Sequence, residues 1–340
     1  MSVRNFFATM AIMILLAAAS ARLQGQVHSS SSYMYLLGEK NTLEHLEFLT
    51  SPQIAGRGAG TAQAKEVADY IAEAFASYGL LPLNSINFYQ PFELPPPRPS
   101  GKRSGGMDAP QGVRKGQQGF NVIGYAPSRN KDAQYIVVGA HFDHIGIHGE
   151  KYYPGADDNA SGVAGMLEIA KAFGKRFVER NDLNHHIVFV AFDGNNYNLS
   201  GSRAFLQKKG IPPHKIACML NLDQMGSTLT PVGEYTEYLQ VLGADKLPPW
   251  QKEQLDFAND YFGLGLLIDY TYYGSRQFYD IFYRLSDQQS FTAAGIPALL
   301  FTSGITKHTN KESDVVPTLS LDVLGKRIEL IYRFLWLLDQ

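Results

Sequence analysis

The stretch Tyr135–Ala170 reads YIVVGAHFDHIGIHGEKYYPGADDNASGVAGMLEIA, and it decides the fold class of the chain. An apolar run of strand length, Tyr135–Ala140, ends directly at His141. A glycine-bounded turn with two acids then leads into an amphipathic helix that begins at Ser161. A buried strand, a polar residue at its carboxyl end and a following helix form the repeating unit of α/β proteins.

The same alternation of strand and helix patterns continues on both sides of this stretch. The sequence predicts further strands at Asn121–Tyr125, His186–Phe192, Ile216–Leu222 and Ala298–Phe301. It predicts helices at Leu43–Leu49, Ala64–Tyr78, Ser161–Phe173, Gly201–Lys209, Pro249–Phe262 and Leu321–Leu338. Near-continuous apolar strands separated by helices indicate a largely parallel sheet covered on both faces, with functional sites at the carboxyl ends of the strands.

Composition places few limits on the function but excludes some partners. The chain has 340 residues, of which 45% are hydrophobic and 18% charged, with a formal net charge of −2. We therefore expect a globular protein without a nucleic-acid partner. Cys218, the only cysteine, lies in an apolar run, so no intramolecular disulfide is expected.

The N-terminus has the pattern of a secretory signal peptide. Arg4 precedes an apolar run, Phe6–Ala19, and small residues follow at Ala19-Ser20-Ala21. This pattern predicts a signal peptide at residues 1–21 and a single mature domain at 22–340, secreted or periplasmic and free of the membrane after cleavage. The alternative is an uncleaved membrane anchor, for which the apolar run is short.

The stretch Pro91–Gln118 is rich in Pro, Gly, Arg and Lys and has few large apolar residues, which favours a flexible surface loop at 91–118. Together with Gly233–Tyr273, it is a candidate for the walls around a site. We expect the ligand to be a peptide or a small amine-containing molecule, and the sequence indicates no oligomeric state.

The candidate metal ligands stand at strand ends. His141 ends one strand, and Asp143 could accept the second imidazole N–H and so fix the tautomer. Asp157 and Asp158 stand at a helix start, where either could be a simple N-cap, but two acids exceed what one cap needs. Asp223 follows a further strand. A histidine and carboxylates in this arrangement indicate a divalent metal site.

A series of motifs then occurs in a specific order along the chain: SPQIAGRGAGT, YIAEAFASYGL, GFNVIGY, VVGAHFDHIG, PGADDNASGVAGMLEIA, VFVAFDG, LSGSRAF, NLDQMG, SDQQSF, AAGIPALLFTSG and KHTNKESD. In these motifs the chain resembles the co-catalytic di-zinc aminopeptidases, the family of bacterial leucyl aminopeptidases related to glutamate carboxypeptidase and glutaminyl cyclase. The resemblance covers nearly the whole mature chain. It implies a three-layer α/β/α sandwich around a central mixed, largely parallel sheet.

The resemblance also implies a role for individual residues. His141 matches the first zinc ligand, with Asp143 as the residue that orients it. Asp158 matches the carboxylate that bridges two metals, and Asp223 the remaining ligand of the first zinc. His308 matches the histidine ligand of the second zinc, although its flank, GITKH, is shorter than the family pattern.

The chain departs from the family at two acids. Where the family has Glu-Glu-x-Gly-Leu-x-Gly-Ser, this chain reads NNYNLSGS from Asn195 to Ser202. By this alignment Asn195 replaces the general base, and Asn196 replaces a carboxylate ligand of the second zinc. An amide cannot accept a proton near neutral pH, and general acid–base catalysis is worth about 10² to 10⁴ in rate. We therefore expect one zinc ion rather than two, and reduced or lost peptidase activity.

Three functional hypotheses remain at this point. The first is a metal-dependent exopeptidase with weak or altered activity. The second is a catalytically inactive relative that binds a peptide or another ligand in the retained cleft. The third, a glutaminyl-cyclase-like acyltransferase, is disfavoured because its single zinc resembles the half-site at Asp158, Asn196 and His308, which is the half that this chain lacks. Glu150 and Glu312 lie in nearby loops and are the candidates for a substitute base.

Overall fold

The computed structural model describes residues 39–83, 85–95, 116–208 and 210–340. The predicted signal peptide at residues 1–21 lies outside the described residues. Every described element belongs to one compact unit, Leu37–Gln340.

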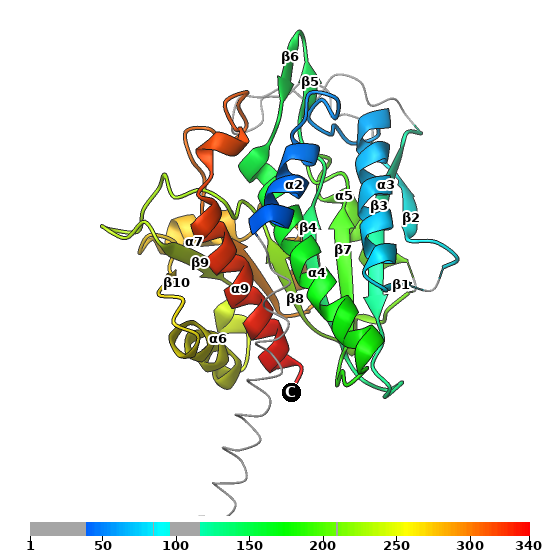
Figure 1. Ribbon diagram of the computed structural model, residues 1–340, viewed down its shortest axis with the longest axis vertical. Coiled ribbons are helices and arrows are strands. Elements are labelled where there is room, and N and C mark those ends of the chain that lie inside the picture. Colours follow the sequence, from blue (N-terminus) through cyan, green and yellow to red (C-terminus); the bar gives the residue numbers. More distant parts are fainter. Residues whose placement is uncertain (1–38, 84, 96–115, 209) are drawn as a thin grey trace, which may run out of the picture. The chain divides into compact units, whose positions relative to one another are not determined.

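A nine-stranded mixed sheet lies at the centre of this unit (Figure 1). Its strand order is β1-β3-β7-β4-β8-β11-β9-β10, and β2 also pairs with β3. The bounds are β1 Leu81–Pro82, β2 Tyr89–Glu93, β3 Gln118–Ala126, β4 Tyr135–His141, β7 His186–Phe192, β8 Ile216–Leu222, β9 Tyr238–Leu242, β10 Leu267–Asp269 and β11 Ala298–Thr302. The four middle strands β7, β4, β8 and β11 are parallel, whereas β3 joins β7, and β9 joins β11, in antiparallel fashion.

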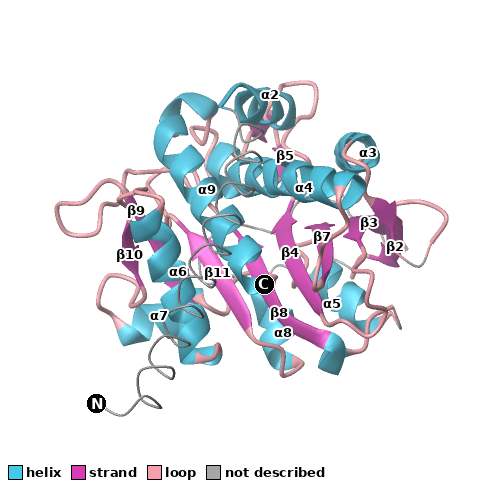
Figure 2. Cartoon of the chain, turned by 60° about the horizontal axis from the view of Figure 1, so that its bottom comes forward, coloured by secondary structure: helices cyan, strands magenta, loops and turns pink. Residues whose placement is uncertain are grey.

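Helices cover both faces of the sheet, as Figure 2 shows. On one face α3 packs on β3, α4 packs on β4 and α9 packs on α4, while α5 and α8 lie on the opposite face. The helix bounds are α2 Glu39–Leu49, α3 Ala62–Ser77, α4 Gly162–Glu179, α5 Ser200–Gln207, α6 Pro249–Tyr261, α7 Arg276–Phe282, α8 Gln288–Ala293 and α9 Leu321–Leu338. The predicted three-layer α/β/α sandwich with a mixed, largely parallel sheet is therefore confirmed.

Local sequence explains where these elements begin and end. The Thr61 side chain caps α3 by accepting the Ala64 N–H at 3.2 Å, and Gly79 follows the helix at φ +79°, a conformation that glycine adopts readily. All seven residues of β7 are buried, because this strand lies between two others and beneath helices on both faces.

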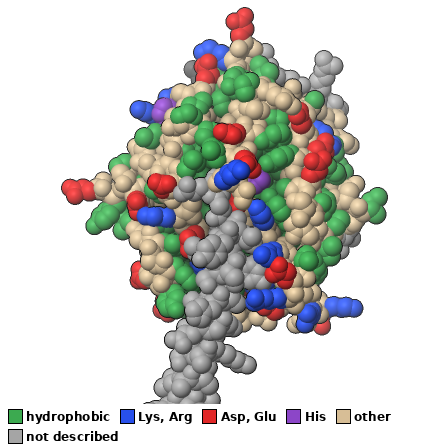
Figure 3. Space-filling view, in the orientation of Figure 1, with side chains coloured by type: hydrophobic (Ala, Val, Ile, Leu, Met, Phe, Trp, Pro, Cys, Tyr) green, Lys and Arg blue, Asp and Glu red, His purple; other side chains and the backbone are tan. Residues whose placement is uncertain are grey.

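The surface seen in Figure 3 carries acidic and basic side chains among apolar and uncharged ones. Lys and Arg side chains lie close to Asp and Glu side chains over much of this face. Among the described residues, no helix is both long enough and apolar enough to cross a membrane. The absence of a nucleic-acid partner stays a prediction.

The structure corrects the predicted loop at 91–118. Tyr89–Glu93 forms the edge strand β2, which pairs antiparallel with the start of β3 at Gln118. Phe92 and Leu94 are buried in a small apolar cluster, which the Pro-rich composition conceals. Pro91 is tolerated because an edge strand does not need every backbone N–H. Residues 96–115 lie outside the described residues.

A two-stranded hairpin projects from the sheet between the strand that ends at His141 and the helix α4. Its strands are β5 Gly146–His148 and β6 Lys151–Tyr153, which pair antiparallel. The Lys151 ammonium group forms an ion pair with Glu312 at 2.8 Å. The hairpin is thereby joined to the loop that contains His308.

Candidate metal site

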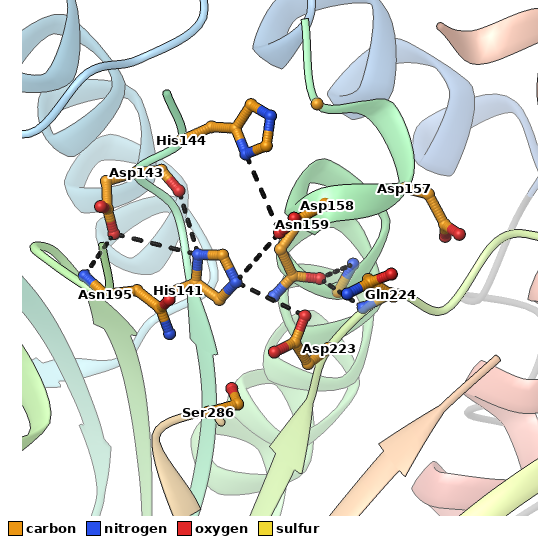
Figure 4. Close-up of polar contacts among 12 residues, drawn as sticks. His141, Asp143, His144, Asp157, Asp158, Asn159, Asn195, Asp223, Gln224 and Ser286 are labelled. Atoms are coloured by element: carbon orange, nitrogen blue, oxygen red, sulfur yellow. Dashed lines mark hydrogen bonds and ion pairs between the residues drawn. The ribbon is translucent and has the colours of Figure 1, made fainter. Parts of the chain in front are cut away.

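Three side chains from separate parts of the chain converge at the carboxyl ends of the parallel strands (Figure 4). His141 is the last residue of β4, Asp223 follows β8, and Asp158 lies in the π-helical turn Ala156–Ser161 before α4. His141 Nε2 lies 3.4 Å from Asp158 Oδ1 and 3.4 Å from Asp223 Oδ1. One ligand atom from each residue lies within 4.8 Å of the others, a spacing that one metal ion can bridge.

The tautomer of His141 is set by a backbone group. Its Nδ1 lies 3.0 Å from the carbonyl oxygen of Asp143, which can only accept, so Nδ1 carries the proton and Nε2 is left to bind a metal. The Asp143 carboxylate is farther away, with Oδ1 3.9 Å from Nδ1. That Oδ1 accepts the backbone N–H of Asn195 at 2.9 Å. Asp143 therefore orients His141 through its main chain and holds the Asn195 turn through its side chain.

Asp314 and Asn159 hold the two carboxylate ligands in place. The Asp314 carboxylate accepts the backbone N–H of Asp157 at 2.8 Å and that of Asp158 at 3.1 Å. Asn159 Nδ2 donates to the Leu222 carbonyl at 2.9 Å, and Asn159 Oδ1 accepts the Gln224 N–H at 3.0 Å. Asn159 thus ties the turn that carries Asp158 to both neighbours of Asp223.

Asp157 has a different role from Asp158. Its carboxylate accepts the N–H of Gly226 at 2.7 Å and the Ser161 hydroxyl at 3.2 Å. These contacts fasten the start of α4 to the loop after β8. Of the two acids that the sequence places at this helix start, one is structural and the other faces His141.

The electrostatics of this site favour a bound cation. Burial raises the pKa of Asp158 to about 7, against the attraction of His141. Burial acts to lower the pKa of His141, but the carboxylates of Asp223, Asp158 and Asp143 outweigh it and raise the pKa to about 10. Without a metal, a proton on His141 therefore compensates the buried carboxylates.

The donor set fits a divalent metal. Asp223 Oδ1 is buried and has no hydrogen-bond partner among the described residues, although it faces His141 Nε2. One imidazole nitrogen and two carboxylate oxygens match the donors of a zinc site that keeps an open position for another ligand.

The two asparagines lie in the turn after β7, beside the metal-site residues. Both Asn195 and Asn196 line a cavity of about 210 Å³ that opens at His141, Asp158 and Asp223. The Asn195 Nδ2 donates to Asp287 Oδ2 at 3.0 Å. Asp287 is fully buried and precedes α8, and burial raises its pKa.

The rest of the cavity wall is partly apolar and partly polar. The apolar lining comes from α7, β11 and nearby loops, and its members are Tyr272, Phe282, Leu285, Leu300 and Ile305. The uncharged polar lining consists of Gln224, Ser286, Thr302, Thr309 and Asn310. Tyr272 lies in the segment expected to supply walls, whereas Tyr270 and Tyr273 hydrogen-bond to Asp256 and to the Thr230 carbonyl.

His308 is not brought into the group formed by His141, Asp158 and Asp223. Its Nδ1 lies 2.9 Å from the Ser313 hydroxyl, and it is not among the cavity-lining residues, although its neighbours Thr309 and Asn310 are. The short loop that carries it ends at Asp314, which is committed to the backbone of Asp157 and Asp158.

Neither candidate for a substitute base reaches the cavity. Glu312 pairs with Lys151, and Glu150 is exposed in the turn between β5 and β6. Asp287, by contrast, contacts the position of the missing base, and sequence reasoning gave it no role. The signal that could have found it is an acid at the start of a short helix, within the family motif SDQQSF.

The chain matches a family profile over more than half of its length. The profile described as "Peptidase family M28" matches residues 121–335, which contain His141, Asp158 and Asp223.

Curated relatives match shorter segments. A BOS complex subunit, ncln, of Danio rerio is 30% identical over 108 residues, which are 30% of this chain and 19% of that protein. A probable zinc metalloprotease of Pyrenophora tritici-repentis is 34% identical over 98 residues, which are 28% of this chain and 21% of that protein. The matched segments thus span about a fifth of these relatives' own length.

Solved structures share the fold over most of the chain. The zinc aminopeptidase BSAP of Bacillus subtilis has a TM-score of 0.67 at 17% identity, covering 89% of this chain and 96% of that chain. The glutaminyl cyclase of Porphyromonas gingivalis has a TM-score of 0.62 at 17% identity, covering 88% and 97%. At these identities the likeness shows the fold alone.

Proposed function

The chain belongs to peptidase family M28, and from this premise we propose that it is a secreted or periplasmic zinc aminopeptidase-like protein whose peptidase activity is reduced or lost. Secretion rests on the signal-peptide pattern at residues 1–21. The proposal of an aminopeptidase-like protein with weak activity rests on the family, the converging ligands and the composition of the cavity wall.

One observation carries the proposal of weak activity. Among the described residues that line the cavity, the only carboxylates are Asp158 and Asp223, both of which belong to the metal group. The positions from which an acid would face a ligand hold Asn195 and Asn196. Apart from the three metal ligands, a peptide bound there meets hydrogen-bonding amides but no side chain able to remove a proton from water.

His141, Asp158 and Asp223 would hold one zinc ion, and when bound it supplies Lewis-acid chemistry that polarises a carbonyl group and lowers the pKa of water. The chain's own residues contribute binding and orientation. Asn195 can accept a hydrogen bond from water or from an amine, and the apolar wall around Phe282 and Leu300 can contact an aliphatic or aromatic side chain. The missing proton transfer costs about 10² to 10⁴ in rate.

The second candidate function is a binding module. The cavity keeps three metal ligands and an apolar wall while it lacks the base, and a relative that is 30% identical over 108 residues, ncln, is named as a subunit of a complex. This candidate predicts binding of peptide amines without turnover.

The test compares hydrolysis of aminoacyl p-nitroanilides by the zinc-loaded wild type, by N195E/N196E, and by N198D as a control. Asn198 lies in the same turn but outside this cavity, so N198D adds an acid without restoring one to the site. The proposal predicts wild-type turnover at least about 10²-fold below that of N195E/N196E, with N198D like the wild type. Chelator-sensitive wild-type turnover equal to that of N195E/N196E would sink the proposal.

A further inference from the structure

The side chain of Asn195 is held from outside the cavity by a buried acid. Its Nδ2 donates to Asp287 Oδ2 at 3.0 Å, across 92 positions of sequence. Asp287 is fully buried. It stands at the N-cap position of α8, yet its side chain makes no capping hydrogen bond there. An aspartate at this position ordinarily caps its own helix, so the contact with Asn195 takes the place of that role.

This contact gives the Asn195 amide a direction. A carboxylate only accepts hydrogen bonds, so the NH₂ group of Asn195 faces Asp287 and the carbonyl oxygen Oδ1 faces the other way. Asn195 lines the cavity together with His141. The accepting atom of the amide therefore lies on the cavity side.

The main chain at this position is fixed as well. The Asn195 N–H donates to the Asp143 carboxylate at 2.9 Å, and Asp143 in turn accepts from His141 through its carbonyl. Two buried carboxylates thus hold one asparagine, one through the backbone and one through the side chain. An amide held at both ends loses little conformational entropy when it binds a ligand.

We propose that Asp287 is a positioning residue that orients Asn195, so that Asn195 Oδ1 accepts a hydrogen bond from an N–H group of an amine or amide ligand in the cavity. This assignment rests on the proposed function, because it takes the cavity as the ligand site. In this arrangement Asn195 orients a ligand, as a general base at the same position would, but it cannot remove a proton.

The pairing of Asn195 with Asp287 predicts the behaviour of a double substitution, which a contact that only stabilises the fold would not. The amide lies on the cavity side and the carboxylate behind it, so exchanging the two residues preserves the hydrogen bond and the net charge. In N195D/D287N the carboxylate faces the cavity, and the amide behind it donates to that carboxylate. The single variant N195D instead places two carboxylates in contact.

The experiment uses L-leucinamide as the probe, with binding to the zinc-loaded full chain measured by calorimetry. D287N should keep the wild-type zinc content and bind leucinamide about three- to tenfold more weakly, the range for one hydrogen bond. D193N is the matched control, because Asp193 is equally buried and accepts from the Phe120 and Gly194 N–H groups instead. Affinity in D193N should equal that of the wild type.

Three further readouts do not depend on leucinamide. The Asn195 side-chain NH₂ signal in a ¹⁵N–¹H correlation spectrum, identified by its loss in N195D, should shift in D287N and stay in place in D193N. The exchange N195D/D287N should unfold at a higher temperature than N195D, and should hydrolyse leucine p-nitroanilide about 10²-fold faster than the wild type.

The inference is overturned if D287N binds leucinamide as tightly as the wild type, if D193N loses as much affinity, or if the Asn195 signal is unmoved in D287N. A wild type that does not bind leucinamide, with the spectral shift and the stability gain as expected, would overturn the proposed function and still support the pairing of Asn195 with Asp287.

Discussion

The His141 imidazole is oriented by the main chain of Asp143 rather than by its side chain, with Nδ1 3.0 Å from the carbonyl oxygen and 3.9 Å from the carboxylate. The Asp143 carboxylate instead accepts the Asn195 N–H at 2.9 Å. Asp143, which the sequence predicts as the partner of His141, therefore connects the metal ligands to the turn that carries Asn195 and Asn196.

This relationship predicts a mild effect of D143N on metal binding. The carbonyl that fixes the His141 tautomer survives the substitution, and an amide oxygen can still accept the Asn195 N–H. Zinc affinity, measured by competition with a chromophoric chelator, should fall less than about tenfold, below the 10- to 100-fold range typical of lost outer-shell partners. A loss above that range would show that the carboxylate orients His141.

The ligand set predicts a contrast between D223N and H308A. Asp223 belongs to the three-residue group, whereas His308 lies outside it and contacts Ser313. In the same competition assay D223N should weaken zinc binding more than about 100-fold, and H308A should leave it unchanged. Equal losses in both variants would place His308 in the metal site.

Zinc binding should depend on pH through His141. The carboxylates around it raise its pKa to about 10, so below that pH the metal-free chain holds a proton on His141 that zinc must displace. Apparent affinity should rise about tenfold per pH unit between pH 7 and the pKa of His141. Below about 7, the pKa to which burial raises Asp158, a second proton should steepen the rise.

Proton release gives a direct measurement of this linkage. Calorimetric titration with zinc at pH 8, in two buffers of different ionisation enthalpy, should report about one proton released per zinc bound. Zinc binding with no proton release at that pH would contradict the assigned charge of His141.

Arg57 holds together segments that flank the metal ligands, and its loss should destabilise the fold. It is fully buried and donates to the carbonyl oxygens of Leu49, Phe142, Pro154 and Gly155. R57A leaves these groups unpaired at about 1–3 kcal/mol each, so the free energy of unfolding in urea should fall by about 4 kcal/mol or more. The control R129A, which removes one exposed contact to the Arg180 carbonyl, should cost no more than about 0.5 kcal/mol. Similar losses in both would refute this role.

The middle of the sheet could be predicted from sequence almost to the residue. The strands at Tyr135, His186 and Ile216 are apolar on both faces because helices cover both sides, and such runs are recognisable without knowledge of their partners. The edges could not be predicted in this way. Tyr89–Glu93 contains a proline and one buried aromatic, so its composition resembles a loop, and only pairing with β3 makes it a strand.

The metal site, like the sheet, is predictable from sequence only in part. His141, Asp158 and Asp223 follow from strand ends and a helix start, because the topology brings such positions together. Asp287 has a weaker signal, because the motif SDQQSF marks the residue but an acid before a short helix resembles a cap, and its partner lies 92 residues away. The displacement of His308 from the cavity depends on the path of one loop, which no periodic pattern encodes.

With amides at Asn195 and Asn196, the chain has a site for one metal, held by His141, Asp158 and Asp223. The most direct test is the zinc content of the wild-type chain after saturation and removal of free metal, by elemental mass spectrometry against protein concentration. We expect one zinc per wild-type chain, and its loss in D223N. Two tightly bound zinc ions per wild-type chain would contradict it.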